Sequence, residues 1–180
     1  MGEAARGRIT VEALGQVERL LLGSIAQALR SAYGLPVVVA DARRYLGRRG
    51  FHARRRQYNA NVLLDGLWDR APERAGCLVG ITRMGIYVPG FNFLFGLSYI
   101  GGHAALVSLE PLRADGAAAR VVRERAAKIA VHETGHALGL EHCRESGCVM
   151  NYSDRLARLD REGIGFGPNC RRKLRRALAA

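Results

Sequence analysis

The chain contains 180 residues, 48% of them hydrophobic, and carries a formal net charge of +12 from 28 basic and 16 acidic residues. This length and hydrophobic content suit one compact domain that can bury a core and divide around a cleft. No stretch approaches the eighteen apolar residues of a membrane span, and no apolar segment follows the charges near the N-terminus, so neither a membrane helix nor a signal peptide is expected. We predict a single domain over residues 1–180, located in the cytoplasm.

The positive charge raises the alternative of a nucleic-acid or anionic-surface partner. Arginines and one lysine gather mainly at residues 43–56 and 171–176. Neither cluster contains the aromatic-interleaved motif of an RNA-binding domain or the ligand spacing of a zinc finger. Solvated helix faces explain the clusters better, so we expect neither a nucleic-acid partner nor a membrane partner.

In the first half of the chain, helices are expected to alternate with strands. The first fifteen residues show no clear pattern and are expected to form a loosely held extension. Apolar residues at helical spacing predict a helix over 16–32, followed by an apolar strand over 36–40. After an arginine-rich loop, a second helix is expected over 55–69 and a strand over 77–82.

The second half predicts a strand pair and a long helix. Segments 91–99 and 103–109 are strand-like and are joined by a Gly-Gly turn, which indicates antiparallel pairing at one side of the sheet. A turn at 115–116 precedes a long helix that leads into a cluster of histidines. The predicted fold is α/β (α+β), with a twisted mixed sheet, an antiparallel edge strand and an active-site helix. We expect an N-terminal lobe over 1–139 and a small irregular C-terminal lobe over 140–180, with a cleft between them.

The segment from His132 to His142 reads H-E-T-G-H-A-L-G-L-E-H and has the spacing of a catalytic zinc site. His132 and His136 are four residues apart, so they project from one helix face and can bind one ion. In a continuing helix His142 would lie roughly 9 Å beyond His136, so the helix must stop. Gly139 can adopt the left-handed conformation that ends it. Three protein ligands leave a fourth position for water and substrate, which is typical of catalytic zinc.

Glu133 lies beside the predicted metal rather than on it. A carboxylate there can take a proton from zinc-activated water and later deliver it to a leaving amine. We therefore predict a zinc metallopeptidase that hydrolyses a peptide or protein substrate with Glu133 as general base. The alternative is a non-catalytic zinc-binding or scaffold protein that retains the motif. The intact Glu133 argues against it, because such a site has no evident use for this carboxylate.

The motif is that of the metzincins, H-E-x-x-H-x-x-G-x-x-H followed by a methionine turn beneath the zinc. Met150 follows the last histidine by eight residues, and Cys143 and Cys148 stand between them. This arrangement resembles the archaemetzincins, whose pattern is H-E-x-x-H-x-x-G-x-x-H-C-x4-C-x-M with a later C-x-x-C. The resemblance extends over about residues 35 to 175 and includes the stretches at 56–60, 92–97 and 107–109. It implies a metzincin-like catalytic domain in which Met150 is an apolar floor beneath the imidazoles rather than a ligand.

The resemblance also implies a second, structural zinc held by four cysteines. Here Gly167 stands where the first cysteine of the C-x-x-C would be. Cys143, Cys148 and Cys170 therefore need a fourth ligand, such as Cys77, an acidic side chain, a histidine or water. Buried free thiols without a metal are a second interpretation, and a Cys143–Cys148 disulfide is a third.

Two further features bear on the substrate. An exposed edge strand can hold an extended peptide through main-chain hydrogen bonds, with little side-chain selection. Tyr152, two residues after the methionine, is placed to stabilise an oxyanion near the metal, with packing as its alternative role.

Overall fold

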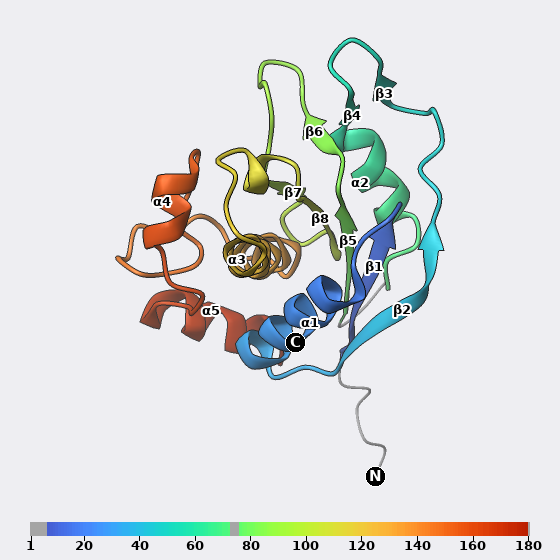
Figure 1. The fold of residues 1–180 in the computed structure, drawn as a ribbon. Coiled ribbons are helices and arrows are strands. Elements are labelled where there is room, and N and C mark those ends of the chain that lie inside the picture. Colours follow the sequence, from blue (N-terminus) through green and yellow to red (C-terminus); the bar gives the residue numbers. More distant parts are fainter. Residues whose placement is uncertain (1–6, 73–75, 180) are drawn as a thin grey trace.

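A mixed five-stranded sheet lies at the centre of the fold (Figure 1). The computed structural model describes residues 7–72 and 76–179. The strands, in sheet order, are β2 (Val37–Arg44), β1 (Ile9–Leu14), β5 (Cys77–Thr82), β8 (Ala104–Ser108) and β7 (Gly96–Ser98). The first four run parallel, whereas β7 pairs antiparallel with β8 at the edge. The predicted mixed sheet with an antiparallel edge strand is therefore confirmed.

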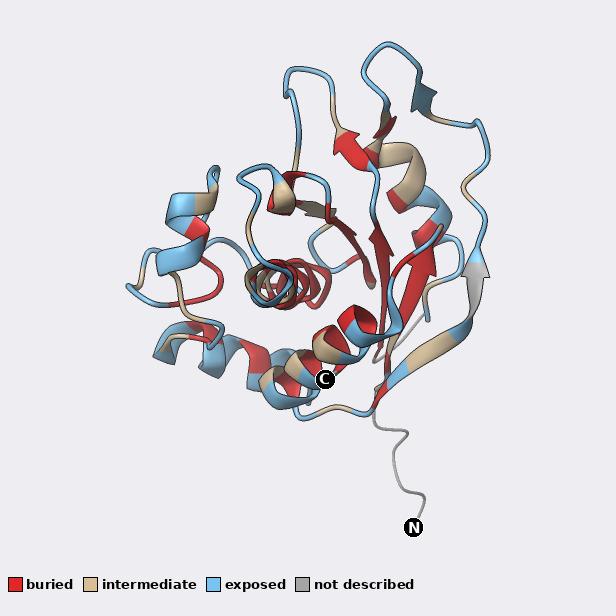
Figure 2. Ribbon diagram, in the orientation of Figure 1, coloured by how far each residue is buried: buried red, intermediate tan, exposed pale blue. Residues whose placement is uncertain are grey.

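Helices cover both faces of this sheet, because side chains alternate in direction along each strand. In β5, Val79 points into a large buried cluster with α1 (Arg19–Tyr33) and α3 (Ala119–Ala137). Its neighbour Leu78 points the other way, into the cluster beneath α2 (Ala60–Trp68). Figure 1 shows α1 and α3 on one side of the sheet and α2 on the other, and Figure 2 shows the buried layer between them. Within the described residues, no helix is both long and apolar enough to cross a membrane.

Strand β1 lies inside the sheet, so the expected loose extension over the first fifteen residues is wrong for Ile9–Leu14. Residues 1–6 lie outside the described residues. The strand is hard to recognise because the charged Glu12 interrupts its apolar pattern. In the fold Glu12 is only 7% exposed, and both of its carboxylate oxygens accept hydrogen bonds from the Arg70 guanidinium at 2.6 and 2.8 Å. This bidentate pair allows a carboxylate in an interior strand.

A second, three-stranded sheet includes residues that were expected to be helical. Its strands, in sheet order, are β3 (Phe51–His52), β4 (Gln57–Asn59) and β6 (Gly85–Tyr87). The helix expected over 55–69 therefore begins only at Ala60. Asn59 is its N-cap, since the Asn59 side chain accepts a hydrogen bond from the Asn61 backbone amide at 3.0 Å. The helical spacing of apolar residues extended the predicted helix past this N-cap, so the prediction wrongly included residues of β4.

Arg125 links α3 to neighbouring segments through ion pairs and hydrogen bonds. Its guanidinium is 4% exposed and pairs with Asp115 and with Asp160, each at 2.7 Å. It also donates to the Leu112 carbonyl in the 3-10 turn η1 (Pro111–Arg113) at 2.9 Å. Hydrogen bonds from this guanidinium lower the pKa of Asp115 to about 2. The long helix is thus held at its N-terminal half by charged contacts as well as by the core.

The C-terminal part contains the helices α4 (Leu156–Arg161) and α5 (Pro168–Ala177). Phe166, just before α5, packs edge-on against Tyr33 of α1 at 5.4 Å between ring centroids. Leu159 and Leu174 belong to the same buried cluster as α1 and α3. One core therefore extends into the C-terminal part, and a lobe boundary after Gly139 stays a prediction.

Tyr33 supplies the first test of this packing. Its buried hydroxyl donates to the Val131 carbonyl of α3 at 2.5 Å. We predict that Tyr33→Phe lowers the free energy of unfolding by about 1 kcal/mol, because one buried hydrogen bond is lost without a cavity. Urea denaturation at fixed zinc concentration measures the change, with the 88% exposed Tyr45 changed to Phe as control. Equal midpoints for both variants would contradict the prediction.

Candidate metal centre and active site

Helix α3 carries His132 and His136 on one face and ends at Ala137. Gly139 then has a φ of +93°, a left-handed conformation that glycine adopts without side-chain strain. The chain turns back, so that the ring centroid of His142 lies 4.7 Å from that of His136 and 5.3 Å from that of His132. Ligand nitrogens of the three side chains lie within 4.8 Å of one another. The structure therefore brings together the three imidazoles that the motif predicts as ligands.

The hydrogen bonds of these rings fit a metal. His132 Nδ1 lies 2.7 Å from the Val149 carbonyl, and His136 Nδ1 lies 2.7 Å from the Leu140 carbonyl. A carbonyl only accepts, so each Nδ1 carries the proton and each Nε2 presents a lone pair. The two Nε2 atoms are 3.0 Å apart. Ligand nitrogens on a tetrahedral zinc lie about 3.3 Å apart, so this donor set matches a shared cation.

Protonation also favours metal binding at these rings. Burial lowers the pKa of His132, His136 and His142, and the hydrogen bonds to the carbonyls only partly offset this effect at the first two. Neutral imidazole is the form that binds a metal. The three rings therefore keep their lone pairs available near neutral pH.

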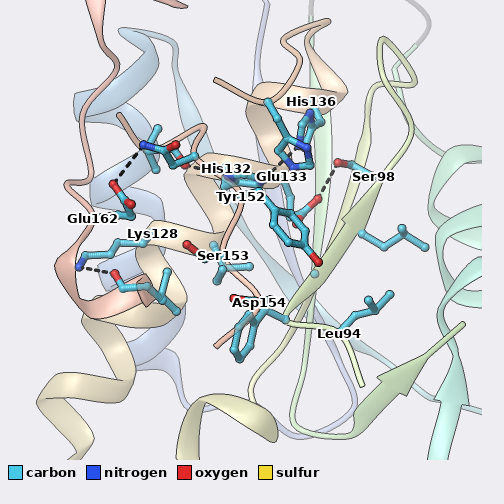
Figure 3. A pocket seen from close by; sticks show the side chains of 18 of the residues that line it. Leu94, Ser98, Lys128, His132, Glu133, His136, Tyr152, Ser153, Asp154 and Glu162 are labelled. Carbon is cyan, nitrogen blue, oxygen red and sulfur yellow. Dashed lines mark hydrogen bonds between the residues drawn. The ribbon is translucent and has the colours of Figure 1, made fainter. Parts of the chain in front are cut away.

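Glu133 lies beside the imidazoles and is 8% exposed. Ser98 of the edge strand β7 donates its hydroxyl proton to Glu133 Oε2 at 2.7 Å, as Figure 3 shows. Burial raises the pKa of the Glu133 carboxyl to about 6, although His136 and the Ser98 hydrogen bond act in the opposite direction. The carboxylate is thus buried, oriented and close to the metal-binding face.

Gly96, on the same strand, makes room for this carboxylate. A β-carbon at Gly96 would lie 2.6 Å from Glu133 Cγ and 2.8 Å from Glu133 Oε1. Sequence reasoning gave no role to Ser98 or to Gly96, which it noted only as part of the family-like stretch 92–97, because no local pattern relates them to Glu133. The antiparallel pairing of β7 with β8 and the packing of α3 against both strands bring them there.

Met150 lies directly against the histidine helix and is fully buried. A β-carbon at Gly135 would lie 2.5 Å from Met150 Sδ, so the sulfur packs where that helix has no side chain. The Cys143 amide donates to the Met150 carbonyl at 2.9 Å and closes the loop between them. This packing suits the apolar floor expected beneath the imidazoles.

A cleft of about 680 Å³ opens in front of the histidines and Glu133. Its apolar wall includes Phe91 and Phe93, which are 53% and 41% exposed. Tyr152 projects into the same cleft and stands edge-on to His142 at 5.3 Å between ring centroids (Figure 3). The cleft therefore combines the polar groups of the metal-binding face with an aromatic wall.

The cysteines form a separate group. The sulfurs of Cys143, Cys148 and Cys170 lie within 4.8 Å of one another, and all four cysteines of the described chain are free thiols. The structure thus shows no Cys143–Cys148 disulfide among the described residues. Cys77 lies in β5 outside this group, where burial raises the pKa of its thiol to about 12. Its sulfur is thus not placed with the other three.

Comparisons with known proteins agree with this arrangement. The sequence profile described as Peptidase family M54 matches residues 18–176. The archaemetzincin of Saccharolobus solfataricus is 31% identical over 172 residues, which covers 93% of this chain and 92% of that protein. The archaemetzincin of Archaeoglobus fulgidus is 38% identical over 69% of this chain and 73% of that protein. The crystal structure of archaemetzincin from Methanopyrus kandleri superposes with a TM-score of 0.84 at 28% identity, covering 99% of each chain.

Zinc content tests the histidine site directly. We expect His136→Ala to weaken binding of one zinc equivalent by at least about 100-fold, because two imidazoles cannot replace three. Elemental analysis after dialysis against a chelator measures the loss. The control is His52→Ala, which changes an exposed histidine on β3. Unchanged zinc content in His136→Ala would show that the ion is bound elsewhere.

Proposed function

The chain belongs to peptidase family M54 and is a zinc metallopeptidase, and on this premise we propose that His132, His136 and His142 hold the zinc and that Glu133 is the general base. Bound zinc supplies a Lewis acid that polarises the scissile carbonyl and makes the attacking water more acidic. One observation carries the proposal: the three imidazoles and the buried carboxylate converge on one wall of a cleft.

Glu133 moves the proton in this proposal. Its carboxylate accepts a proton from the attacking water and later delivers that proton to the nitrogen of the leaving amine. Ser98 is a positioning residue, because its hydrogen bond to Oε2 fixes the direction of Oε1. Gly96 leaves space for the carboxylate to stay in that position.

Strand β7 is the proposed binding site for the substrate main chain. It is the outermost strand on its side of the sheet, and its residues line the cleft beside Glu133. An extended peptide can add to this edge through main-chain hydrogen bonds, which places a peptide bond near Ser98 and Glu133. The exposed rings of Phe91 and Phe93 favour an apolar side chain in the adjoining part of the cleft.

Tyr152 is the proposed stabiliser of the oxyanion. The ring packs against His142 while about half of the side chain stays exposed, so the residue can both hold the imidazole and face the substrate. A phenol donor aimed at a carbonyl oxygen that gains charge lowers the barrier of acyl transfer.

Peptide cleavage by zinc-loaded protein tests the general base. We predict that Glu133→Gln lowers hydrolysis of a mixed-length peptide library by about 10³-fold, because the amide cannot accept the water proton. Zinc content should stay the same, since Glu133 is not a proposed ligand. The control is Glu141→Gln, which removes an exposed carboxylate next to His142.

Two outcomes would contradict this function. Full activity in Glu133→Gln would place the base elsewhere. Absence of cleavage by the unchanged protein, with zinc bound, would favour the non-catalytic zinc-binding or scaffold alternative.

Tyr152→Phe separates the oxyanion role from packing. We predict that kcat falls by about 10²-fold while KM changes little, because the lost hydrogen bond forms only as the oxyanion develops. Steady-state kinetics on one cleaved peptide measures both constants, with Tyr45→Phe as control. An unchanged kcat would leave Tyr152 with only its packing contact to His142.

A further inference from the structure

The cysteine group is one ligand short of a closed zinc site. Structural zinc is almost always four-coordinate, with cysteine, histidine or carboxylate ligands. Cys143, Cys148 and Cys170 supply three sulfurs from the loop after the histidines and from α5. Among the described residues, neither Cys77 nor any histidine joins this group.

Glu145 lies between the two loop cysteines, and its main chain surrounds them. The Glu145 amide donates to Cys143 Sγ at 3.3 Å, and the Glu145 carbonyl accepts from the Cys148 amide at 3.1 Å. The residue is therefore built into the cysteine loop.

The side chain of Glu145 reaches across to α5. Its Oε1 accepts a hydrogen bond from the Asn169 side-chain amide, one residue before Cys170. A β-carbon placed on Gly167 would overlap Glu145 Oε2. The carboxylate thus occupies the volume into which a cysteine side chain at position 167 would project.

Glu145 Oε2 is also buried, and the described residues offer it no hydrogen-bond partner. A buried carboxylate oxygen without a partner is costly, so it indicates an unseen donor or cation. Two arginines of α5 bond elsewhere: Arg171 donates to the Phe166 carbonyl at 3.0 Å and Arg172 to Asn169 Oδ1 at 2.5 Å. No ion pair within the described residues includes Glu145.

We propose that Glu145 Oε2 is the fourth ligand of a second zinc site formed with Cys143, Cys148 and Cys170. The carboxylate takes the place of the cysteine that Gly167 lacks, and the missing side chain at Gly167 gives the carboxylate its space. Glu145 is not part of the 4.8 Å group that the three sulfurs form, so the proposal requires its Oε2 to move toward them for an ion to be shared. Its ligands are distinct from the three histidines proposed for the catalytic zinc.

Zinc binding in a His136→Ala background tests the assignment, because the remaining zinc equivalent then reports the cysteine site alone. We expect this protein to keep one zinc equivalent and Glu145→Gln to weaken that binding by about 100-fold, since an amide is a poor zinc ligand. Competition with a chromophoric chelator measures the affinity. Glu141→Gln, in the same background, is the control for loss of a nearby carboxylate.

A rescue variant distinguishes a lost ligand from a damaged fold. Glu145→Ala combined with Gly167→Cys removes the carboxylate and supplies a fourth thiolate in the vacated space. We expect this double variant to restore tight zinc binding. When cobalt replaces zinc, the sulfur-to-metal charge-transfer absorbance of the double variant should be about one third higher than that of the protein with Glu145 and Gly167 unchanged. The reason is that the number of thiolate ligands increases from three to four.

Three results would overturn the proposal. Unchanged affinity in Glu145→Gln would mean that water or another group completes the site and that Glu145 only contacts the start of α5. Absence of zinc from the His136→Ala protein would mean that the cysteines are free thiols. Failure of the double variant to restore binding, with its circular dichroism unchanged, would separate position 167 from the metal.

Discussion

His132 Nε2 and His136 Nε2 lie only 3.0 Å apart, and much of the surrounding structure serves to hold them there. Two unprotonated nitrogens at this distance repel unless a cation lies between them. The carbonyls that fix the tautomers belong to Leu140 and Val149, which lie beyond the end of α3. The metal-binding face therefore depends on how the chain leaves the helix. Gly139 allows that reversal, and the contact of Met150 with Gly135 fixes where the returning loop lies.

The catalytic carboxylate depends on a different element. Glu133 comes from the same helix, but Gly96 and Ser98 of β7 determine its space and orientation. Because β7 is also the sheet edge beside the cleft, the strand proposed to hold the substrate main chain also holds the proposed base. Arg125 and the buried cluster fix α3, so this pairing is attached to a rigid helix.

The sequence predicts local features of this protein better than distant ones. The histidine spacing follows from helix geometry alone, and the Gly-Gly turn indicates the β7–β8 pair. Strand β1 was not predicted because a glutamate such as Glu12 is typical of an exposed position. Its partner Arg70, which neutralises the charge, lies far away in the sequence. Ser98 escaped for a similar reason, since a lone serine gains meaning only when sheet pairing brings it to Glu133. In both cases the missing information was a contact between segments remote in sequence, which residue periodicity does not encode.

The two proposed metal sites share one short loop. This connection offers a physical reason why the chain can have Gly167 where the family pattern has a cysteine. His142 and Cys143 are adjacent, and Cys148 is adjacent to Val149, whose carbonyl orients His132. A zinc ion bound by Cys143, Glu145, Cys148 and Cys170 would tie this loop to α5 and restrict the motion of that carbonyl. A damaged cysteine site would instead leave the loop held by its own hydrogen bonds and by Met150. If Glu145 replaces the missing cysteine as a ligand, the zinc ion still links this loop to α5, because Glu145 itself belongs to the loop.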